Sequence, residues 1–143
     1  MATEVTKMQP LAGSLVELYI ALDRVYQEAS KEIGLSPQQA QLLCAADWKS
    51  PALGELADAL NCDKTNITGL ADRVERLDLV ERVADPDDRR VTRLEVTEKG
   101  KELISRLHAE LNRRLEDGRF SGLPDSESIT RMARKLLAEQ GSD

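Results

Sequence analysis

The stretch from Asp63 to Thr97, DKTNITGLADRVERLDLVERVADPDDRRVTRLEVT, determines how the rest of the chain is organised. Asp63 is a suitable N-cap, and the apolar residues after it recur at helical spacing, which predicts a helix from about Lys64. The apolar face of this helix consists of Ile67, Leu70, Ala71, Val74 and Leu77. From Leu79 the apolar residues alternate with polar ones, which is typical of two short strands, and turn formers lie between the strands from Asp85 to Arg90. The sequence therefore predicts a helix followed by a β-hairpin with a charged tip.

The outer side of the predicted helix and the hairpin tip carry residues that suit DNA. An α-helix fits the major groove, and a hairpin tip can reach the backbone or the minor groove. Asn suits a bidentate contact to adenine, Thr a contact to thymine, and Arg a contact to phosphate. An ordinary helix start and a solvated turn have the same composition, and Arg73 and Arg76 could instead pair along the helix with Asp72, Glu75 or Asp78. Together the two elements favour DNA contacts at Lys64, Thr65, Asn66, Thr68, Arg73, Asp88, Arg89 and Arg90.

Three further helices are predicted before this stretch. The first spans about residues 8–33 and ends at Gly34. The motif Ser36-Pro37-Gln38-Gln39 is a capping box with Pro at the first helical position, so a second helix starts there. A short third helix covers residues 53–60. A tight turn joins it to the helix that follows Asp63, and such a pair is a helix-turn-helix.

Two more helices are predicted after the hairpin, at about residues 98–118 and 125–139. Thr97 can cap the first of them, whose apolar residues form a near-heptad seam. The seam consists of Leu103, Ile104, Leu107, Leu111 and Leu115. The last helix is expected to bury Ile129, Met132, Ala133, Leu136 and Leu137. The flanking helices carry more leucine than one small domain can cover, so we expect an intertwined homodimer.

The fold class that follows is mainly α with a small β-hairpin wing (α+β). With 143 residues, the chain has the ordinary length of one domain, and we expect a single domain over residues 1–143. A winged helix-turn-helix lobe for DNA binding would cover about residues 36–97. N- and C-terminal dimerisation helices, at about residues 8–33 and 98–139, would flank this lobe.

The composition, with 41% apolar and 32% charged residues, fits a soluble and helix-rich chain. No apolar run is long enough to span a bilayer, and the N-terminus lacks a signal pattern, so we expect a cytoplasmic protein with no membrane partner. The net charge of −6 argues weakly against nucleic acid binding. Because the local field depends on where charges lie on the surface, the acidic total predicts weak non-specific DNA binding.

Several motifs, in this order along the chain, resemble the MarR family of bacterial transcription regulators. The tip Asp85-Pro86-Asp87-Asp88-Arg89-Arg90 followed by Val96-Thr97-Glu98-Lys99-Gly100 is specific in combination. The other matching motifs are Leu53-Gly54-Glu55-Leu56-Ala57, Asp63-Lys64-Thr65-Asn66-Ile67-Thr68 and Leu79-Val80-Glu81-Arg82. The resemblance covers about residues 8–139. It implies a homodimer with two winged-helix lobes that represses its own gene and a neighbouring gene. It also implies that a small phenolic or anionic ligand releases this homodimer from DNA.

The resemblance also implies roles for the charged residues of the hairpin tip. Arg90 would enter the minor groove, and Asp88 would hold it there through a carboxylate–guanidinium pair. Arg89 would meet a phosphate.

Three positions depart from the pattern of the family. Gly69 stands where an Arg is often found, which removes a potential DNA donor and costs about 0.5–1 kcal/mol of helix stability relative to Ala. Asp78 replaces the usual Gly before the first strand, and Asp tolerates the left-handed conformation better than most residues. Ala52 replaces the usual Ser or Thr cap of the third helix, at a cost of roughly 1 kcal/mol.

Cys44 and Cys62 leave an oxidant-sensing regulator open as an alternative. Cys44 lies among apolar residues, which favours a core position. Cys62 lies just before a helix N-terminus, where a thiol can become more reactive, although packing is again the simpler role. His108 is the only histidine and has no ligand cluster around it, so neither a metal nor another cofactor is expected.

Tyr19, Tyr26 and Trp48 could line an effector cleft between the first helix and the DNA-binding lobe, or could simply pack. No nucleophile–base pair, Gly-rich phosphate loop or paired-acid motif appears, so the chain is not expected to be an enzyme. The leading function is a homodimeric repressor that binds a pseudo-palindromic site on double-stranded DNA. The alternative from another class is a winged-helix protein-interaction module without DNA binding, which the acidic balance and Gly69 favour.

Overall fold

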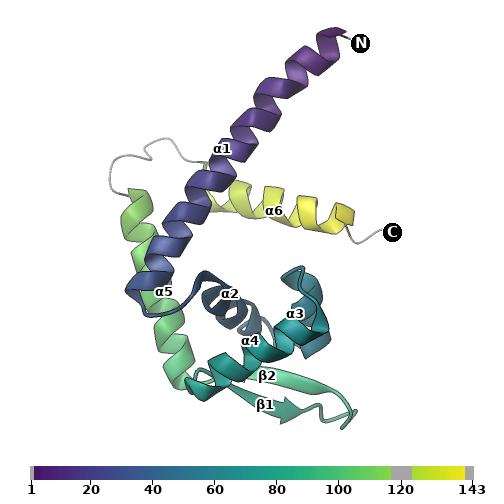
Figure 1. Cartoon of the computed structure of the whole chain (residues 1–143), viewed down its shortest axis with the longest axis vertical. Coiled ribbons are helices and arrows are strands. Elements are labelled where there is room, and N and C mark those ends of the chain that lie inside the picture. The colour runs from purple at the N-terminus through teal and green to yellow at the C-terminus, as the bar shows by residue number, and fades with distance from the viewer. Residues whose placement is uncertain (1, 117–123, 141–143) are drawn as a thin grey trace. The chain divides into compact units, whose positions relative to one another are not determined.

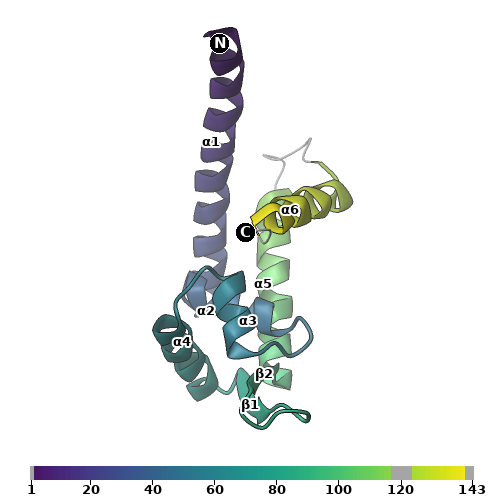
Figure 2. The ribbon, with the colours of Figure 1, turned by 90° about the vertical axis from the view of Figure 1, so that its right-hand side faces the viewer.

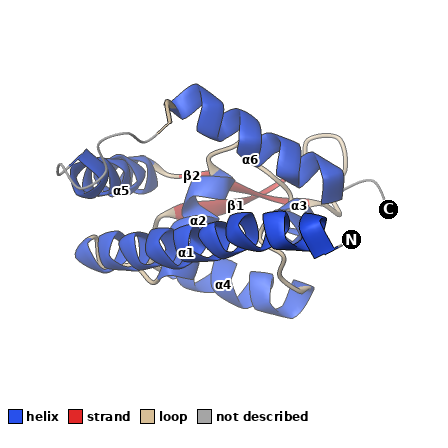
Figure 3. Ribbon diagram, turned by 90° about the horizontal axis from the view of Figure 1, so that it is seen from above, coloured by secondary structure: helices blue, strands red, loops and turns tan. Residues whose placement is uncertain are grey.

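The computed structural model describes residues 2–116 and 124–140, which form helices and one two-stranded antiparallel sheet (Figures 1 and 3). This arrangement confirms the predicted fold class. The contacts divide the chain into two compact units, residues 1–112 and 113–143. The elements are α1 (Ala2–Glu32), α2 (Pro37–Ala46), α3 (Leu53–Ala59), α4 (Lys64–Arg76), β1 (Val80–Ala84), β2 (Thr92–Val96), α5 (Glu98–Glu116) and α6 (Ser126–Gln140).

The first helix is longer than predicted, because it begins at Ala2 and not near residue 8. The prediction began at the first residue of the apolar stripe, but a helix needs only adequate backbone propensity, which Ala, Glu and Lys supply before the stripe. Within the first unit, the N-terminal part of α1 extends away from α2, α3 and α4 (Figure 2).

Local capping signals set the starts of the next helices as predicted. The Ser36 hydroxyl accepts a hydrogen bond from the Gln39 amide at 3.1 Å, and the Gln39 side chain accepts one from the Ser36 amide at 3.0 Å. Ala52 has no side-chain acceptor, but the Glu55 carboxylate accepts from its backbone N–H at 3.1 Å. The capping box at α3 therefore keeps the hydrogen bond from the cap backbone to the Glu55 side chain and lacks the one that a Ser or Thr would accept. The remaining hydrogen bond reduces the loss of helix stability predicted for alanine at this cap.

The core of the first unit lies between α2, α3, α4 and the hairpin. Leu42, Leu56 and Leu94 come from three of these elements and are almost fully buried. The predicted stripe of α4 is buried except for its last member. Leu77 is 41% exposed, because α4 ends at Arg76 and Leu77 is its C-cap.

The hairpin is fixed to α4 by a tight connection at Asp78. Asp78 has φ 60°, so an aspartate adopts the left-handed conformation that glycine would favour, as predicted. The strands then pair in the register Val80 with Val96 and Ala84 with Thr92. Thr97 caps α5 by accepting from the Gly100 amide at 3.1 Å, and its own hydroxyl donates to the Asp78 carbonyl at 2.6 Å. This hydroxyl therefore joins the start of α5 to the start of the wing.

Several large apolar side chains of the outer helices are exposed. On α5, Ile104 and Leu107 are buried. On α6, Met132 and Leu137 are 50% and 64% exposed, and their burial, expected against a second chain, stays a prediction. The exposed large apolar residues of α1 are Leu11, Leu15, Val16, Leu18, Tyr19, Ile20 and Leu22. No helix within residues 2–116 and 124–140 has the length and apolar character needed to cross a membrane.

Candidate nucleic-acid interface

The start of α4 presents the predicted polar residues, and the structure defines what each side chain already does. Asp63 accepts from the backbone N–H of Asn66 at 2.8 Å and from the Asn66 side-chain amide at 3.1 Å. The Thr68 hydroxyl donates to the Lys64 carbonyl at 2.7 Å. The amide of Asn66 is therefore tied to the cap and keeps its oxygen as an acceptor. Thr68 is exposed, and its hydroxyl oxygen and methyl group remain available to a ligand. Lys64 and Thr65 are exposed as well.

Asp85 organises the loop that forms the wing tip. It is 8% exposed, and its carboxylate accepts from the backbone N–H groups of Asp87 at 2.8 Å and Asp88 at 3.0 Å. The Arg93 guanidinium also donates to this carboxylate through Nε. The hydrogen bond from Arg93, together with those from the two backbone amides, lowers the pKa of Asp85 below its usual value. Asp85 is therefore an ionised anchor for the whole tip.

Arg93 extends the same network from the hairpin to the helix-turn-helix. Its Nη1 donates to the Ser50 carbonyl at 3.2 Å and to the Glu55 carboxylate at 3.4 Å. One guanidinium on β2 therefore fixes the tip loop, the connection before α3 and the first turn of α3 relative to one another.

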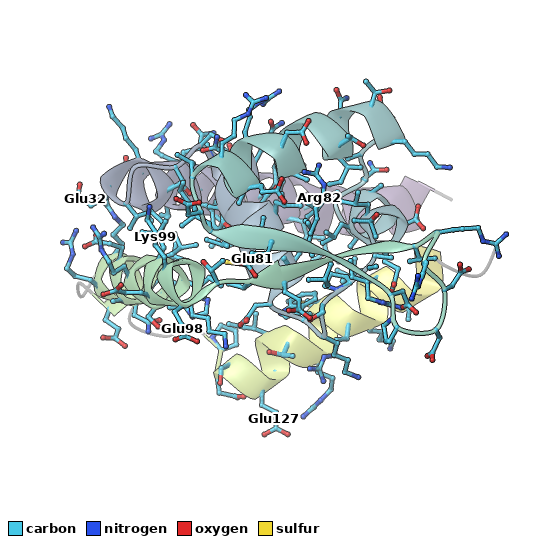
Figure 4. All side chains as sticks on the ribbon, turned by 90° about the horizontal axis from the view of Figure 1, so that it is seen from below. Glu32, Glu81, Arg82, Glu98, Lys99 and Glu127 are labelled. Carbon is cyan, nitrogen blue, oxygen red and sulfur yellow. The ribbon has the colours of Figure 1, made fainter. Side chains whose placement is uncertain are left out.

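Arg82 makes the matching connection from β1 to the predicted recognition helix, α4, and Figure 4 shows it on the face of the hairpin that lies toward α4. Its guanidinium contacts Asp72 at 2.5 Å and Glu75 at 2.8 Å, and the Glu75 carboxylate also accepts from the Arg82 backbone N–H at 3.1 Å. These contacts occupy two of the three acids that were considered as helix partners of Arg73 and Arg76. Among the residues that the structure describes, no acidic side chain forms an ion pair with Arg73 or Arg76.

Arg90 projects from the tip with its side chain 91% exposed. The Asp88 carboxylate accepts from Arg90 Nε at 3.1 Å, from its Nη2 at 3.3 Å and from its backbone N–H at 3.1 Å. These contacts, led by the side-chain hydrogen bond, lower the pKa of Asp88. The guanidinium is thus held in one orientation while most of its surface remains available, and the neighbouring Arg89 is exposed as well.

Asp85, Arg82 and Arg93 are not among the predicted site residues. Asp85 begins the turn Asp-Pro-Asp-Asp, and an Asp that accepts from the amides two and three residues ahead is a known turn signature, so this residue carried a usable signal. The two arginines gave none, because their partners lie on elements that only the folded chain brings near.

Substituting Asp85 with asparagine should change how the stability of the chain depends on pH. Because folding lowers the Asp85 pKa, its stabilising effect is present above the unfolded value of about 3.9 and is lost as the pH falls through the lower folded value. Asp85→Asn should therefore be less stable at pH 7 and should lose less stability than the wild type between pH 5 and about 2, measured by urea denaturation. Asp58→Asn, at an exposed helix position, is the matched control. Parallel pH profiles for wild type and Asp85→Asn would contradict this role.

The remaining candidate residues are separate from the tip. Tyr19 and Trp48 are 71% and 70% exposed, whereas Tyr26 is half-buried. Burial raises the pKa of the Cys44 thiol, so little reactive thiolate forms near neutral pH. Cys62 is half-buried beside the start of α4. Within the described part of the chain, no group of His, Cys, Asp and Glu residues could hold a metal ion.

Comparison with known proteins identifies the family of this chain. The sequence model of the MarR family matches residues 35–92. In Bacillus subtilis (strain 168), the HTH-type transcriptional regulator MhqR is 31% identical over 98 residues, which are 63% of this chain and 68% of that protein. The uncharacterized HTH-type transcriptional regulator YsmB of the same strain is 35% identical over 91 residues. That match covers 64% of this chain and 62% of YsmB, less than two thirds of its length.

Solved structures show the same fold. CouR from Rhodococcus jostii RHA1, solved with bound p-coumaroyl-CoA, superposes with a TM-score of 0.77 at 24% identity and covers 93% of each chain. A mutant MarR from E. coli, solved in complex with operator DNA, gives a TM-score of 0.69 at 21% identity, with 92% of this chain and 96% of that chain covered. The order of helices and hairpin, the matched segment and these likenesses agree. The chain belongs to the MarR family of winged helix-turn-helix transcription regulators.

Proposed function

We propose that two copies of this chain form a cytoplasmic repressor that binds a pseudo-palindromic operator. Each lobe would place α4 in a major groove and its wing in the flanking minor groove, with half-sites about 34–36 Å apart. The observation that supports this most directly is Arg90, whose exposed guanidinium is oriented by Asp88 at the wing tip. The DNA contacts proposed are Lys64, Thr65, Asn66, Thr68, Arg73, Asp88, Arg89 and Arg90.

DNA binding is tested by filter retention of genomic fragments at low salt, where weak electrostatic binding is strongest. The wild-type chain should retain a small set of fragments that share an inverted repeat. Retention of no fragment would favour the alternative, a winged-helix module that binds proteins. The DNA complex of the E. coli relative supports the first outcome.

A homodimer is proposed from the uncovered apolar face of α1. Side chains that are half-exposed over several turns, such as Leu15, Val16 and Leu22, form a patch of the kind that a second chain covers. Sedimentation at micromolar concentration should therefore give twice 15.9 kDa. Leu15→Glu combined with Leu22→Glu should shift the mass toward the monomer, because two carboxylates would be buried in the interface. A wild-type mass of 15.9 kDa would rule out the dimer.

A small phenolic or anionic effector is proposed to release the operator by changing the spacing of the two lobes. The p-coumaroyl-CoA bound to CouR supports a small-molecule signal of this kind. Tyr19, Tyr26 and Trp48 remain the proposed contacts, and the exposed rings of Tyr19 and Trp48 are free to meet a ligand. An oxidant signal through Cys62 is the alternative. Intact DNA binding with no thiol modification after mild peroxide, measured by mass spectrometry, would exclude that alternative.

A further inference from the structure

A hollow of about 230 Å³ lies between the first two turns of α2 and one side of α4, and we name it the α2–α4 hollow. Gln38 and Gln41 line it from α2, and Asn66 and Arg73 line it from α4. Leu60, Cys62 and Leu70 complete the wall. None of these lining residues is acidic, and their polar groups are three amides, one thiol and the Arg73 guanidinium.

The Arg73 guanidinium is positioned for a ligand in this hollow. Arg73 lies near the end of α4, but its side chain folds back along the helix, so that Nη2 is 3.6 Å from the place where a Cβ on Gly69 would be. Helical side chains point toward the N-terminus in this way. Within the described part of the chain, no acidic side chain forms an ion pair with Arg73. Its charge is therefore available to an anion.

The hollow and the wing lie on opposite flanks of α4. A second cleft contains Lys64 and Thr68 together with Arg90 of the wing, whereas the α2–α4 hollow contains Asn66 and Arg73. At 100° per residue, Thr68 and Asn66 point about 160° apart around the helix axis. A helix in the major groove has a sugar-phosphate strand on each side, so one flank faces the strand next to the wing and the other faces the opposite strand.

We propose that the α2–α4 hollow binds a phosphate of the DNA strand that borders the major groove on the side away from the wing. Arg73 supplies the cation, and the exposed amides of Gln38 and Gln41 supply neutral hydrogen bonds. The inference rests on the proposed function and adds two residues of α2 to the interface. This second contact would let an acidic chain hold both strands of its site. On each lobe, Arg73 would meet one DNA strand, and Lys64 and Arg90 beside the wing would meet the other.

The test measures affinity for a fluorescein-labelled duplex that the wild-type chain selects from a random-sequence pool. Gln41→Glu places a carboxylate in the hollow and should weaken binding at least about tenfold, because repulsion replaces a hydrogen bond in both lobes. Asn112→Asp makes the same change of charge at an exposed position near the end of α5 and should bind like the wild type. Arg73→Gln should lower the slope of log K against log salt by about one per lobe.

The possible outcomes separate this inference from the function on which it rests. If the wild type selects a duplex and Gln41→Glu binds it as tightly as Asn112→Asp, the hollow does not hold a phosphate, and the repressor proposal stands. If the wild type selects no duplex, both proposals fail. Urea denaturation of each variant shows whether it is folded, and Gln38→Glu repeats the test from the neighbouring amide.

Discussion

Gly100→Ala is expected to lower the free energy of unfolding by at least about 2 kcal/mol, because the position has no room for a Cβ. Gly100 is buried in the first turn of α5, where that turn packs on the start of the hairpin. An added Cβ would overlap with the Leu79 carbonyl oxygen and would lie 2.7 Å from Val96 Cγ1. The Leu79 oxygen belongs to the backbone and accepts from the Thr97 amide at 3.0 Å, so it cannot move aside without breaking this joint.

Gly69→Ala is the matched control, since it makes the same change inside a helix where space is open. The only atom near the added Cβ would be the end of the Arg73 side chain at 3.6 Å, an ordinary van der Waals contact. This variant should gain about 0.5–1 kcal/mol from helix propensity. The two midpoints of urea denaturation should therefore move in opposite directions. Equal midpoints for Gly100→Ala and the wild type would show that α5 does not pack closely on the hairpin.

The parts of the fold that could be predicted from the sequence are those with local causes. Ser36, Asp63 and Thr97 cap helices through amides three residues ahead, and the apolar stripe of α4 follows from spacing alone. The tip of the wing is also local, because Asp85 and Asp88 bind their own loop. These features required no knowledge of neighbouring elements.

The charge distribution of the site could not be predicted, because it depends on contacts between distant segments. Over residues 63–97, acidic residues outnumber basic ones, which on its own does not favour DNA binding. In the folded chain Arg82 pairs with Asp72 and Glu75 of α4, and Arg93 pairs with Asp85. The acids thus neutralise structural arginines. The arginines proposed to meet DNA are others, Arg73, Arg89 and Arg90, all of which are exposed.

Arg90→Ala is expected to weaken operator binding by at least about an order of magnitude while leaving the fold and the dimer intact. The side chain is 91% exposed and belongs to no apolar cluster, so its removal should cost little stability. A narrow A·T-rich minor groove concentrates negative potential and attracts an inserted guanidinium. A contact worth about 1–3 kcal/mol corresponds to a several-fold to hundredfold change in affinity, and it would occur twice per dimer.

Two further variants show what kind of contact Arg90 makes, and all are compared by fluorescence anisotropy on one selected operator. Asp88→Ala should produce a weaker form of the Arg90→Ala defect, because it frees the guanidinium from its hydrogen bonds without removing it. Thr68→Ala should instead reduce the preference among major-groove sequences, since it removes a methyl group and a hydroxyl oxygen that can still accept a hydrogen bond from a base. An Arg90→Ala variant with wild-type affinity would remove the wing from the interface. The helix α4 and the α2–α4 hollow would then have to supply the binding free energy, and the loss in Arg73→Gln should be correspondingly larger.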